Sequence, residues 1–337
     1  MGERGQLFLL DKTQWEKAVS LGLGHGITYL ILARGTDKQH SITSWLAKAI
    51  EKHTGIGRKR AAKYIDELKA QQLVRPSPKV NGWPRLALTL TNEPNWVFLP
   101  NTIVDGASGE VPPLERIRRR GYVEALKMLI DAYAMHDLAN DDGLDWRLIR
   151  QSFTRSAITE RGNWAIWGFN IKNSQADWGC PLRRQFPKTT EGNEIFWKVF
   201  EILTDASLIE AHPYLVEGLH DGAELIFPLD EEGTEIEQQL FHNANGAARA
   251  LLGEDTGIEH RLDDYEIISP VSTDWPNAEV VGIYRLRYRP KTKATAFWYH
   301  KQLEWERFAE SFGAMASDDA RPPENSQSAP SKRVQRG

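Results

Sequence analysis

The chain has 337 residues, a net charge of −4 at pH 7 and 41% hydrophobic residues, which is the composition of an ordinary globular protein of about two domains. Its single cysteine, Cys180, excludes an intramolecular disulfide and a zinc site built from several cysteines. The N-terminal apolar run is too short for a secretory signal, and no apolar stretch approaches the ~18 residues of a transmembrane helix. We therefore expect a cytoplasmic protein with no membrane partner.

The charge is unevenly distributed along the chain. Between Arg34 and Arg85 there are 12 Lys and Arg against 4 Asp and Glu, a local charge of +8. Between Glu191 and Asp274 there are 3 Lys and Arg against 20 Asp and Glu, a local charge of −17. A basic surface attracts polyanions, whereas an acidic surface attracts a basic partner or is simply solvated, so the two regions are expected to serve different purposes.

The first predicted elements begin at residue 7. A short strand at 7–10 and a helix at 12–19 precede the glycines of the GLGHG stretch at 22–26, whose spacing favours a flexible connector. The helix predicted over 27–33 is apolar on almost every side, which indicates a helix buried among its neighbours.

Two further helices and a hairpin follow. A helix over 44–53 has its apolar residues on one face, and the TGIG sequence at 54–57 forms a tight turn after it. A basic helix is predicted over 58–72. Strands at 73–75 and 86–90 then form a hairpin, with prolines and a glycine shaping the segment between them.

This order of elements resembles the winged helix-turn-helix superfamily of DNA-binding proteins. The resemblance rests on the helix at 44–53, the TGIG turn, the helix RKRAAKYIDELKAQQLV and the hairpin around KVNGWPRL, and it covers about a fifth of the chain. It is specific to the superfamily and not to one family. It implies that residues 26–90 bind double-stranded DNA, with the N-terminal half of the basic helix in the major groove.

The positive residues of this region are the predicted DNA contacts. Some of Arg58, Lys59, Arg60 and Lys63, which crowd the start of the basic helix, would read base edges. A second set on the preceding helix and on the wing would contact phosphates and set the register: Lys48, Lys52, Arg75, Lys79 and Arg85. The alternative is the solvated charged face of an ordinary helical domain.

The rest of the chain is predicted to form a linker at 92–113 and a second winged-helix-like module with insertions at 114–312. The candidate third helix of that module, 193–205, is acidic, so phosphate would repel it and the module would instead mediate assembly. We therefore predict a mainly α fold with small β wings (α+β), a DNA-binding domain at 1–91 and a disordered tail at 313–337.

Two further basic stretches suggest a second nucleic-acid surface. One begins a helix near residue 116, and the other is a hairpin predicted over 280–300, in which basic and aromatic residues alternate. The residues concerned are Arg116, Arg118, Arg119, Arg120, Arg285, Arg287, Arg289, Lys291 and Lys293. For the hairpin we favour the alternative, an edge protected by charge with its aromatic residues in the core.

Signals for catalysis are weak. The chain has neither a GxxxxGK[ST] phosphate loop nor an HExxH zinc helix. His212 and His220, the acids Asp263 and Asp264, and Cys180 each lack a partner at a useful spacing. We expect no enzyme activity, no metal and no cofactor.

The leading hypothesis is a sequence-specific transcriptional regulator that binds double-stranded DNA and is associated with the nucleoid if the protein is bacterial. A replication initiator of a plasmid, phage or integrated element is the alternative in the same class, because tandem winged helices resemble that architecture. A third hypothesis is a protein-interaction module localised to DNA, whose acidic region at 191–274 binds a basic protein. A further hypothesis is that the protein forms a homodimer through its C-terminal domain.

Overall fold

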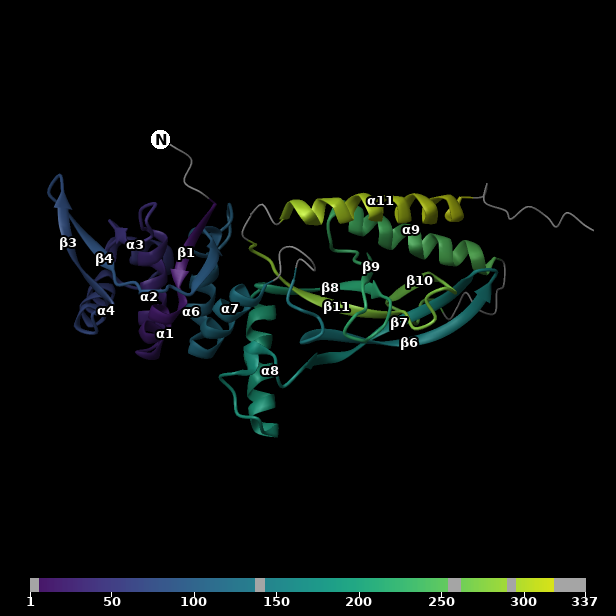
Figure 1. Cartoon of the computed structure of the whole chain (residues 1–337), viewed down its shortest axis with the longest axis horizontal. Helices are drawn as coiled ribbons and strands as arrows, with labels where there is room; N and C mark the ends of the chain where they lie inside the picture. Colours follow the sequence, from purple (N-terminus) through teal and green to yellow (C-terminus); the bar gives the residue numbers. More distant parts are fainter. Residues whose placement is uncertain (1–5, 137–142, 254–261, 290–294, 318–337) are drawn as a thin grey trace, which may run out of the picture. The chain divides into compact units, whose positions relative to one another are not determined.

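The computed structural model describes residues 6–136, 143–253, 262–289 and 295–317 (Figure 1). The chain divides into two compact units, each made of several segments. The first unit comprises residues 1–152, 173–212 and 281–300, and the second comprises 153–172, 213–280 and 301–337.

The N-terminal part of the first unit is mainly helical and carries a small sheet. Its elements are β1 (Leu7–Asp11), α1 (Lys12–Ser20), α2 (Leu23–Arg34), β2 (Ile42–Thr43), α3 (Ala47–Thr54), α4 (Arg58–Ala70), β3 (Val74–Val80) and β4 (Trp83–Leu88). Strands β2, β4 and β3 form an antiparallel sheet in that order. The helices predicted over 27–33, 44–53 and 58–72 are thus present, each with shifted ends.

The stretch expected to be a flexible connector is instead the first turn of α2. A Cβ atom at Gly24 would lie 2.5 Å from the Tyr64 ring, and one at Gly26 would lie 2.7 Å from the Val19 side chain. The glycines are therefore required for the close packing of α2 against α4 and α1, because any side chain would hold these helices apart.

The residues predicted to be a linker, 92–113, contain β5 (Trp96–Pro100) and α5 (Thr102–Asp105). Strand β5 pairs antiparallel with β1 over its whole length. Val97, Leu99, Ile103 and Val104 are buried in the core of the first unit. Two helices, α6 (Pro113–Arg120) and α7 (Val123–Met135), come next.

The prediction of a mainly α fold with small β wings is wrong, because the structure is 42% helix and 28% strand and has a large curled antiparallel sheet. Its six strands follow the order β10-β7-β6-β11-β8-β9. They are β6 (Ile149–Arg161), β7 (Trp164–Ala176), β8 (Ile209–Val216), β9 (Leu225–Pro228), β10 (Ile267–Ser272) and β11 (Glu279–Leu286). The described part of 114–312 therefore combines this sheet with helices, and it is not the second winged-helix-like module that was predicted.

The physical reason for this error lies in β6 and β7, which have 13 residues each and are joined at Gly162 and Asn163. Polar and charged side chains such as Arg155 and Glu160 interrupt the apolar alternation of β6, which hides a long strand in the sequence. The pairing of β6 with β11, in which Val281 faces Ser152, joins segments about 130 residues apart and has no local signature.

The remaining elements are the 3-10 turn η1 (Pro181–Arg183) and the helices α8 (Thr190–Asp205), α9 (Glu235–Leu252) and α11 (Thr295–Ala316). The strand predicted to return over 294–300 is not found among the described residues, because the chain is helical from Thr295 to Ala316. The tail expected to be disordered was placed at 313–337; α11 extends to Ala316, and residues 318–337 lie outside the described ranges.

In the second unit, α9 and α11 lie side by side along one face of the sheet (Figure 1). Ile166 and Ile268 of the sheet pack with Ala248 and Leu252 of α9. The Asn243 amide donates a hydrogen bond of 2.7 Å to the Ala309 carbonyl, which ties the two helices together.

Substitution of Gly26 tests the close packing of α1 and α2. We expect Gly26→Ala to lower the free energy of unfolding by about 1–3 kcal/mol, because the new Cβ collides with Val19 and the core has to shift. Urea unfolding measures the change. The matched control is Gly57→Ala, where an added Cβ meets nothing within 4 Å, and equal stability of the two variants would contradict the packing argument.

Candidate nucleic-acid interface

Helix α4 separates its basic and apolar residues onto opposite sides. Ala61, Ile65 and Leu68 are buried, and their spacing places them on one face of the helix. The predicted base-reading residues Arg58, Lys59, Arg60 and Lys63 are all exposed. No acidic residue lies in the first turn of α4, so this helix end combines the side-chain charges with the positive end of the helix dipole.

These cations are weakly held by the protein. Arg58 Nε lies 3.4 Å from Glu51 Oε2, and Lys63 Nζ lies 3.7 Å from Glu67 Oε1; both cationic side chains are more than half exposed. Within the described ranges neither Lys59 nor Arg60 forms an ion pair. Exposed pairs of this kind contribute about 0–1 kcal/mol, so a phosphate can replace the carboxylate at small cost.

The turn before α4 is fixed by local hydrogen bonds. Gly55 has a φ of +67°, the left-handed conformation that closes α3, and the Thr54 hydroxyl donates to the Ile50 carbonyl at 2.6 Å. The Ile56 side chain is buried in the hydrophobic core of the first unit. Lys48 and Lys52 lie exposed on α3, before this turn.

A contact between His25 and Glu67 fixes α4 to α2. His25 Nε2 lies 2.6 Å from Glu67 Oε2, and the His25 ring lies 4.6 Å from the Tyr64 ring. The hydrogen bond with His25, assisted by the charge of Lys63, holds the pKa of Glu67 below its usual range. This partly exposed contact therefore helps to fix the rotation of α4 about its own axis, which sets where the cations point.

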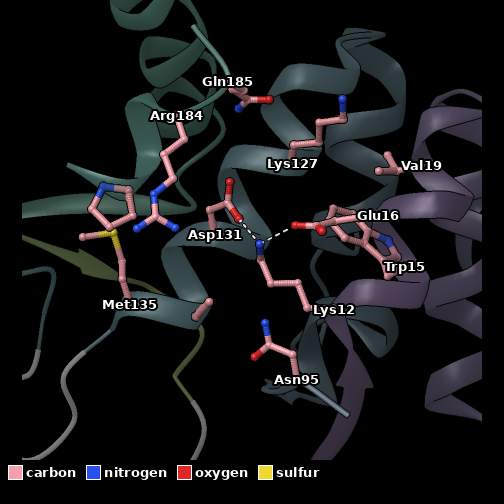
Figure 2. Close-up of a pocket in the computed structure, with 12 residues that line it drawn as sticks. Lys12, Trp15, Glu16, Val19, Asn95, Lys127, Asp131, Met135, Arg184 and Gln185 are labelled. Carbon is pink, nitrogen blue, oxygen red and sulfur yellow. Dashed lines mark hydrogen bonds and ion pairs between the residues drawn. The ribbon is translucent and has the colours of Figure 1, made fainter. Parts of the chain in front are cut away.

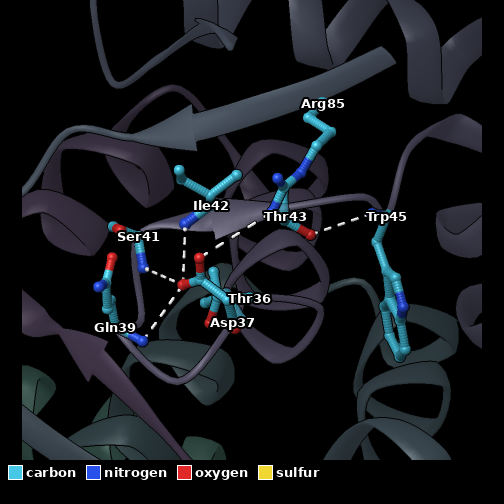
Figure 3. A network of polar contacts seen from close by, with 9 residues as sticks. Thr36, Asp37, Gln39, Ser41, Ile42, Thr43, Trp45 and Arg85 are labelled. Atoms are coloured by element: carbon cyan, nitrogen blue, oxygen red, sulfur yellow. Dashed lines mark hydrogen bonds and ion pairs between the residues drawn. The ribbon is translucent and has the colours of Figure 1, made fainter. Parts of the chain in front are cut away.

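The wing, which is the β3–β4 hairpin, exposes two of its three predicted cations to solvent. Arg75 and Lys79 are exposed on β3, and neither has an ion-pair partner in the part of the chain that the structure describes. Arg85 is half-buried, with its guanidinium 4.0 Å from Asp37. Figure 3 shows how the same Asp37 organises the loop before α3. Its carboxylate accepts hydrogen bonds from the amides of Gln39, Ser41 and Ile42.

The basic cluster on α6 is partly engaged within the first unit. Arg116 donates to the Ala206 carbonyl at 2.6 Å and to the Tyr288 hydroxyl. Arg119 pairs with Glu115, and Arg118 lies partly buried close to Gly55. Arg120 is exposed at the end of the helix. The four arginines of this cluster therefore differ in burial and in their hydrogen-bond and ion-pair partners.

The alternating basic stretch at 285–289, which begins on β11, is partly buried and partly paired with carboxylates of the first unit. Arg285 is only 2% exposed, and Arg287 lies 3.1 Å from Glu110 and 3.6 Å from Glu210. Burial lowers the pKa of the Arg289 guanidinium. The interpretation of this stretch as a sheet edge was wrong, because β11 lies between β6 and β8. The predicted Lys291 and Lys293 lie outside the described residues.

A network of rings and charges connects α3 to α2 and α5. The Trp45 and His53 rings are stacked, with centroids 4.8 Å apart and an interplanar angle of 8°. Asp105 binds Arg34 at 2.7 Å and lies 3.7 Å from His53 Nδ1. Desolvation lowers the pKa of His53 against the opposing effect of Asp105, so the neutral ring is favoured in the folded state.

A cavity of about 610 Å³ opens in the first unit on α1 and α7 (Figure 2). Lys12 Nζ bridges Glu16 at 2.5 Å and Asp131 at 2.9 Å. Desolvation raises the pKa of Asp131 although Lys12 opposes it, while hydrogen bonds to both carboxylates raise the pKa of Lys12 against desolvation. Lys12 therefore forms ion pairs with both acidic side chains that line this cavity.

The acidic region contains both exposed and structural carboxylates. Helix α8 buries Phe196, Val199 and Phe200 and exposes its acidic side chains, which are Glu191, Glu194, Glu201 and Asp205. Glu237 of α9 is instead buried, accepts a hydrogen bond of 2.7 Å from the Tyr214 hydroxyl and completes the capping box of its own helix.

Other site chemistry is sparse in the described residues. They contain no group of three or more His, Cys, Asp or Glu placed to hold a metal ion. Cys180 is buried, and desolvation raises the pKa of its thiol. No helix in the described ranges combines the length and apolar character needed to cross a membrane.

Comparisons of the chain with protein-family models, with curated proteins and with solved structures find no match.

Sequence reasoning missed three features of this region, two of which have local signals. Asp37, in a short loop after a helix, is placed to accept from backbone amides, as Asp commonly does in turns. Asn81-Gly82 between alternating residues signals a two-residue hairpin turn, which extends the wing to Val80 and Trp83. The contact of His25 with Glu67 spans 42 residues and has no local signal.

The lowered pKa of His53 makes a prediction about stability and pH. A histidine whose folded-state pKa is depressed stabilises the fold above its unfolded pKa and loses that contribution as the pH falls. We expect the wild type to lose more unfolding free energy than His53→Phe between about pH 7 and about pH 5. The phenylalanine keeps a ring against Trp45, and urea unfolding at several pH values measures both. Parallel pH profiles would contradict the assignment.

Proposed function

We propose that residues 26–90 form a winged helix-turn-helix that binds double-stranded DNA, and that the protein is a sequence-specific transcriptional regulator acting in the cytoplasm. The element order α2-β2-α3-α4-β3-β4 and the sheet order β2-β4-β3 support this proposal, because both are expected for that superfamily. The tight turn at Gly55 between α3 and α4 supports it as well.

The observation that carries the proposal is the set of exposed and weakly paired cations on three consecutive elements. Four lie on the first half of α4, two on α3 and two on β3: Arg58, Lys59, Arg60, Lys63, Lys48, Lys52, Arg75 and Lys79. The acidic residues of α4, Asp66 and Glu67, lie in its second half. On α4 itself, a polyanion that approaches the start of the helix therefore meets only positively charged side chains.

The division of labour follows from the position of each cation. Residues in the first turns of α4 project from a rigid helix into the predicted major-groove contact, where a good bidentate pair with a base is worth about 1–3 kcal/mol of discrimination. Cations on α3 and on the wing are placed on either side of that helix in the sequence and would bind phosphates, which sets the register of α4 on the duplex.

The acidic outer face of α8 supports a different role for the rest of the protein. Its exposed carboxylates would be repelled by phosphate, so we assign this surface to assembly, either with a second copy of the chain or with a basic protein. The replication-initiator alternative rested on tandem winged helices, whereas the described part of 114–312 contains the six-stranded sheet.

The test begins with selection of bound sequences from a pool of random duplex DNA, in which we expect enrichment of a defined site. Against that site, Lys59→Ala combined with Arg60→Ala should weaken binding by about 10- to 100-fold. The slope of log K against log salt should become shallower by about 0.9 for each lost phosphate contact. Fluorescence anisotropy of a labelled duplex measures both quantities.

Lys69→Ala is the matched control, because Lys69 lies in the second half of the same helix and already pairs with Asp66 at 2.9 Å. It should leave the affinity for the selected site within about twofold of the wild type. Absence of any enriched sequence, or unchanged affinity and slope in the double variant, would overturn the proposed function.

A further inference from the structure

The tip of the β3–β4 hairpin carries an exposed apolar pair. Trp83 is 74% exposed, the largest value among the large hydrophobic residues in the described ranges, and Val80 is 49% exposed. The two residues face each other across the hairpin on either side of the Asn81-Gly82 turn. A tryptophan left in water at the end of a projecting hairpin contributes nothing to the core, so its position requires another explanation.

The backbone holds this tip in a defined conformation. Asn81 and Gly82 have φ values of +50° and +80°, as a type I′ turn demands, and such turns match the twist of the flanking strands. Pro76, Pro78 and Pro84 restrict the backbone on both sides of the tip. The ring is therefore presented by a stiff support, which reduces the entropy lost when it binds.

The surroundings of Trp83 are cationic. Residues 74–88 contain Arg75, Lys79 and Arg85 and no Asp or Glu. Arg75 and Lys79 are exposed and have no ion pair within the described part of the chain. An aromatic ring on a hairpin that also exposes cations is complementary to a nucleotide, which offers an apolar sugar and base next to a phosphate. The same charges would oppose the approach of an identical tip from a second copy.

We infer that Trp83, supported by Val80, is an apolar wedge that contacts the sugars and base edges of the DNA minor groove beside the site read by α4. This inference rests on the proposed function, because it places the duplex on the same face as the cations of α4. Apolar side chains that enter the minor groove partly unstack a base step and bend the duplex. Lys79, four residues before Trp83, would bind a flanking phosphate independently of the wedge.

The test uses the full-length protein and the duplex selected for the wild type. Trp83→Ala should weaken binding about tenfold, because loss of one aromatic contact to a base is commonly worth that much, while Trp83→Phe should retain most of the affinity. The salt slope should stay unchanged in Trp83→Ala, since no charge is removed, whereas Lys79→Ala should flatten it by about 0.9. Hydroxyl-radical footprinting should show lost protection of minor-groove sugars at the flank of the site.

Phe98→Ala is the matched control, because Phe98 is 50% exposed on β5, outside the hairpin, and its loss should leave affinity and footprint unchanged. Thermal unfolding of each variant checks that the fold is intact. Wild-type affinity and an unchanged footprint in Trp83→Ala would overturn the wedge, while loss of binding in the Lys59 and Arg60 double variant would still support the proposed function. Sedimentation that shows a wild-type dimer and a monomeric Trp83→Ala protein would also overturn it, because the ring would then be a subunit contact.

Discussion

The burial of helix α2 is the constraint on which the first unit depends. Every residue from Gly26 to Ala33 is buried, so neighbouring elements must pack around the whole circumference of this helix. The missing side chains at Gly24 and Gly26 allow α4 and α1 to approach it closely, and Trp15 donates a hydrogen bond to the Gly26 carbonyl. Because α4 is seated directly on α2, the direction of its cations is determined by packing and does not depend on the DNA.

This arrangement joins binding to the core of the protein. The side of α4 that faces the core carries apolar residues and the opposite side carries the basic residues, while Glu67, which contacts His25, is partly exposed and also pairs with Lys63. A helix held in this way loses little conformational freedom when it binds, so most of the favourable contact energy remains available for affinity. The cations themselves are nearly free, which keeps the electrostatic attraction strong at a distance.

The sequence predicted the local features of the first unit, but it did not predict which distant segments of the chain pair with one another. Helical spacing placed Ala61, Ile65 and Leu68 opposite the cations of α4, and the turn at Gly55 followed from its residue type. The six-stranded sheet could not be derived for two reasons. The alternation typical of a strand does not indicate which other strand it pairs with, and polar residues interrupt that alternation in β6. For the first of these reasons the alternating arginines of β11 suggested a surface, whereas the neighbouring strands bury Arg285.

The prolines of β3 have a consequence for behaviour in concentrated solution. Strand β3 is the outer strand of its sheet, and an outer strand with free amides can pair with the same strand of another molecule. Pro76 and Pro78 have no amide hydrogen, and Arg75 and Lys79 add like charges along the same edge. The hairpin is thereby protected against edge-to-edge association, so an exposed and partly apolar projection can persist on the surface without seeding aggregation.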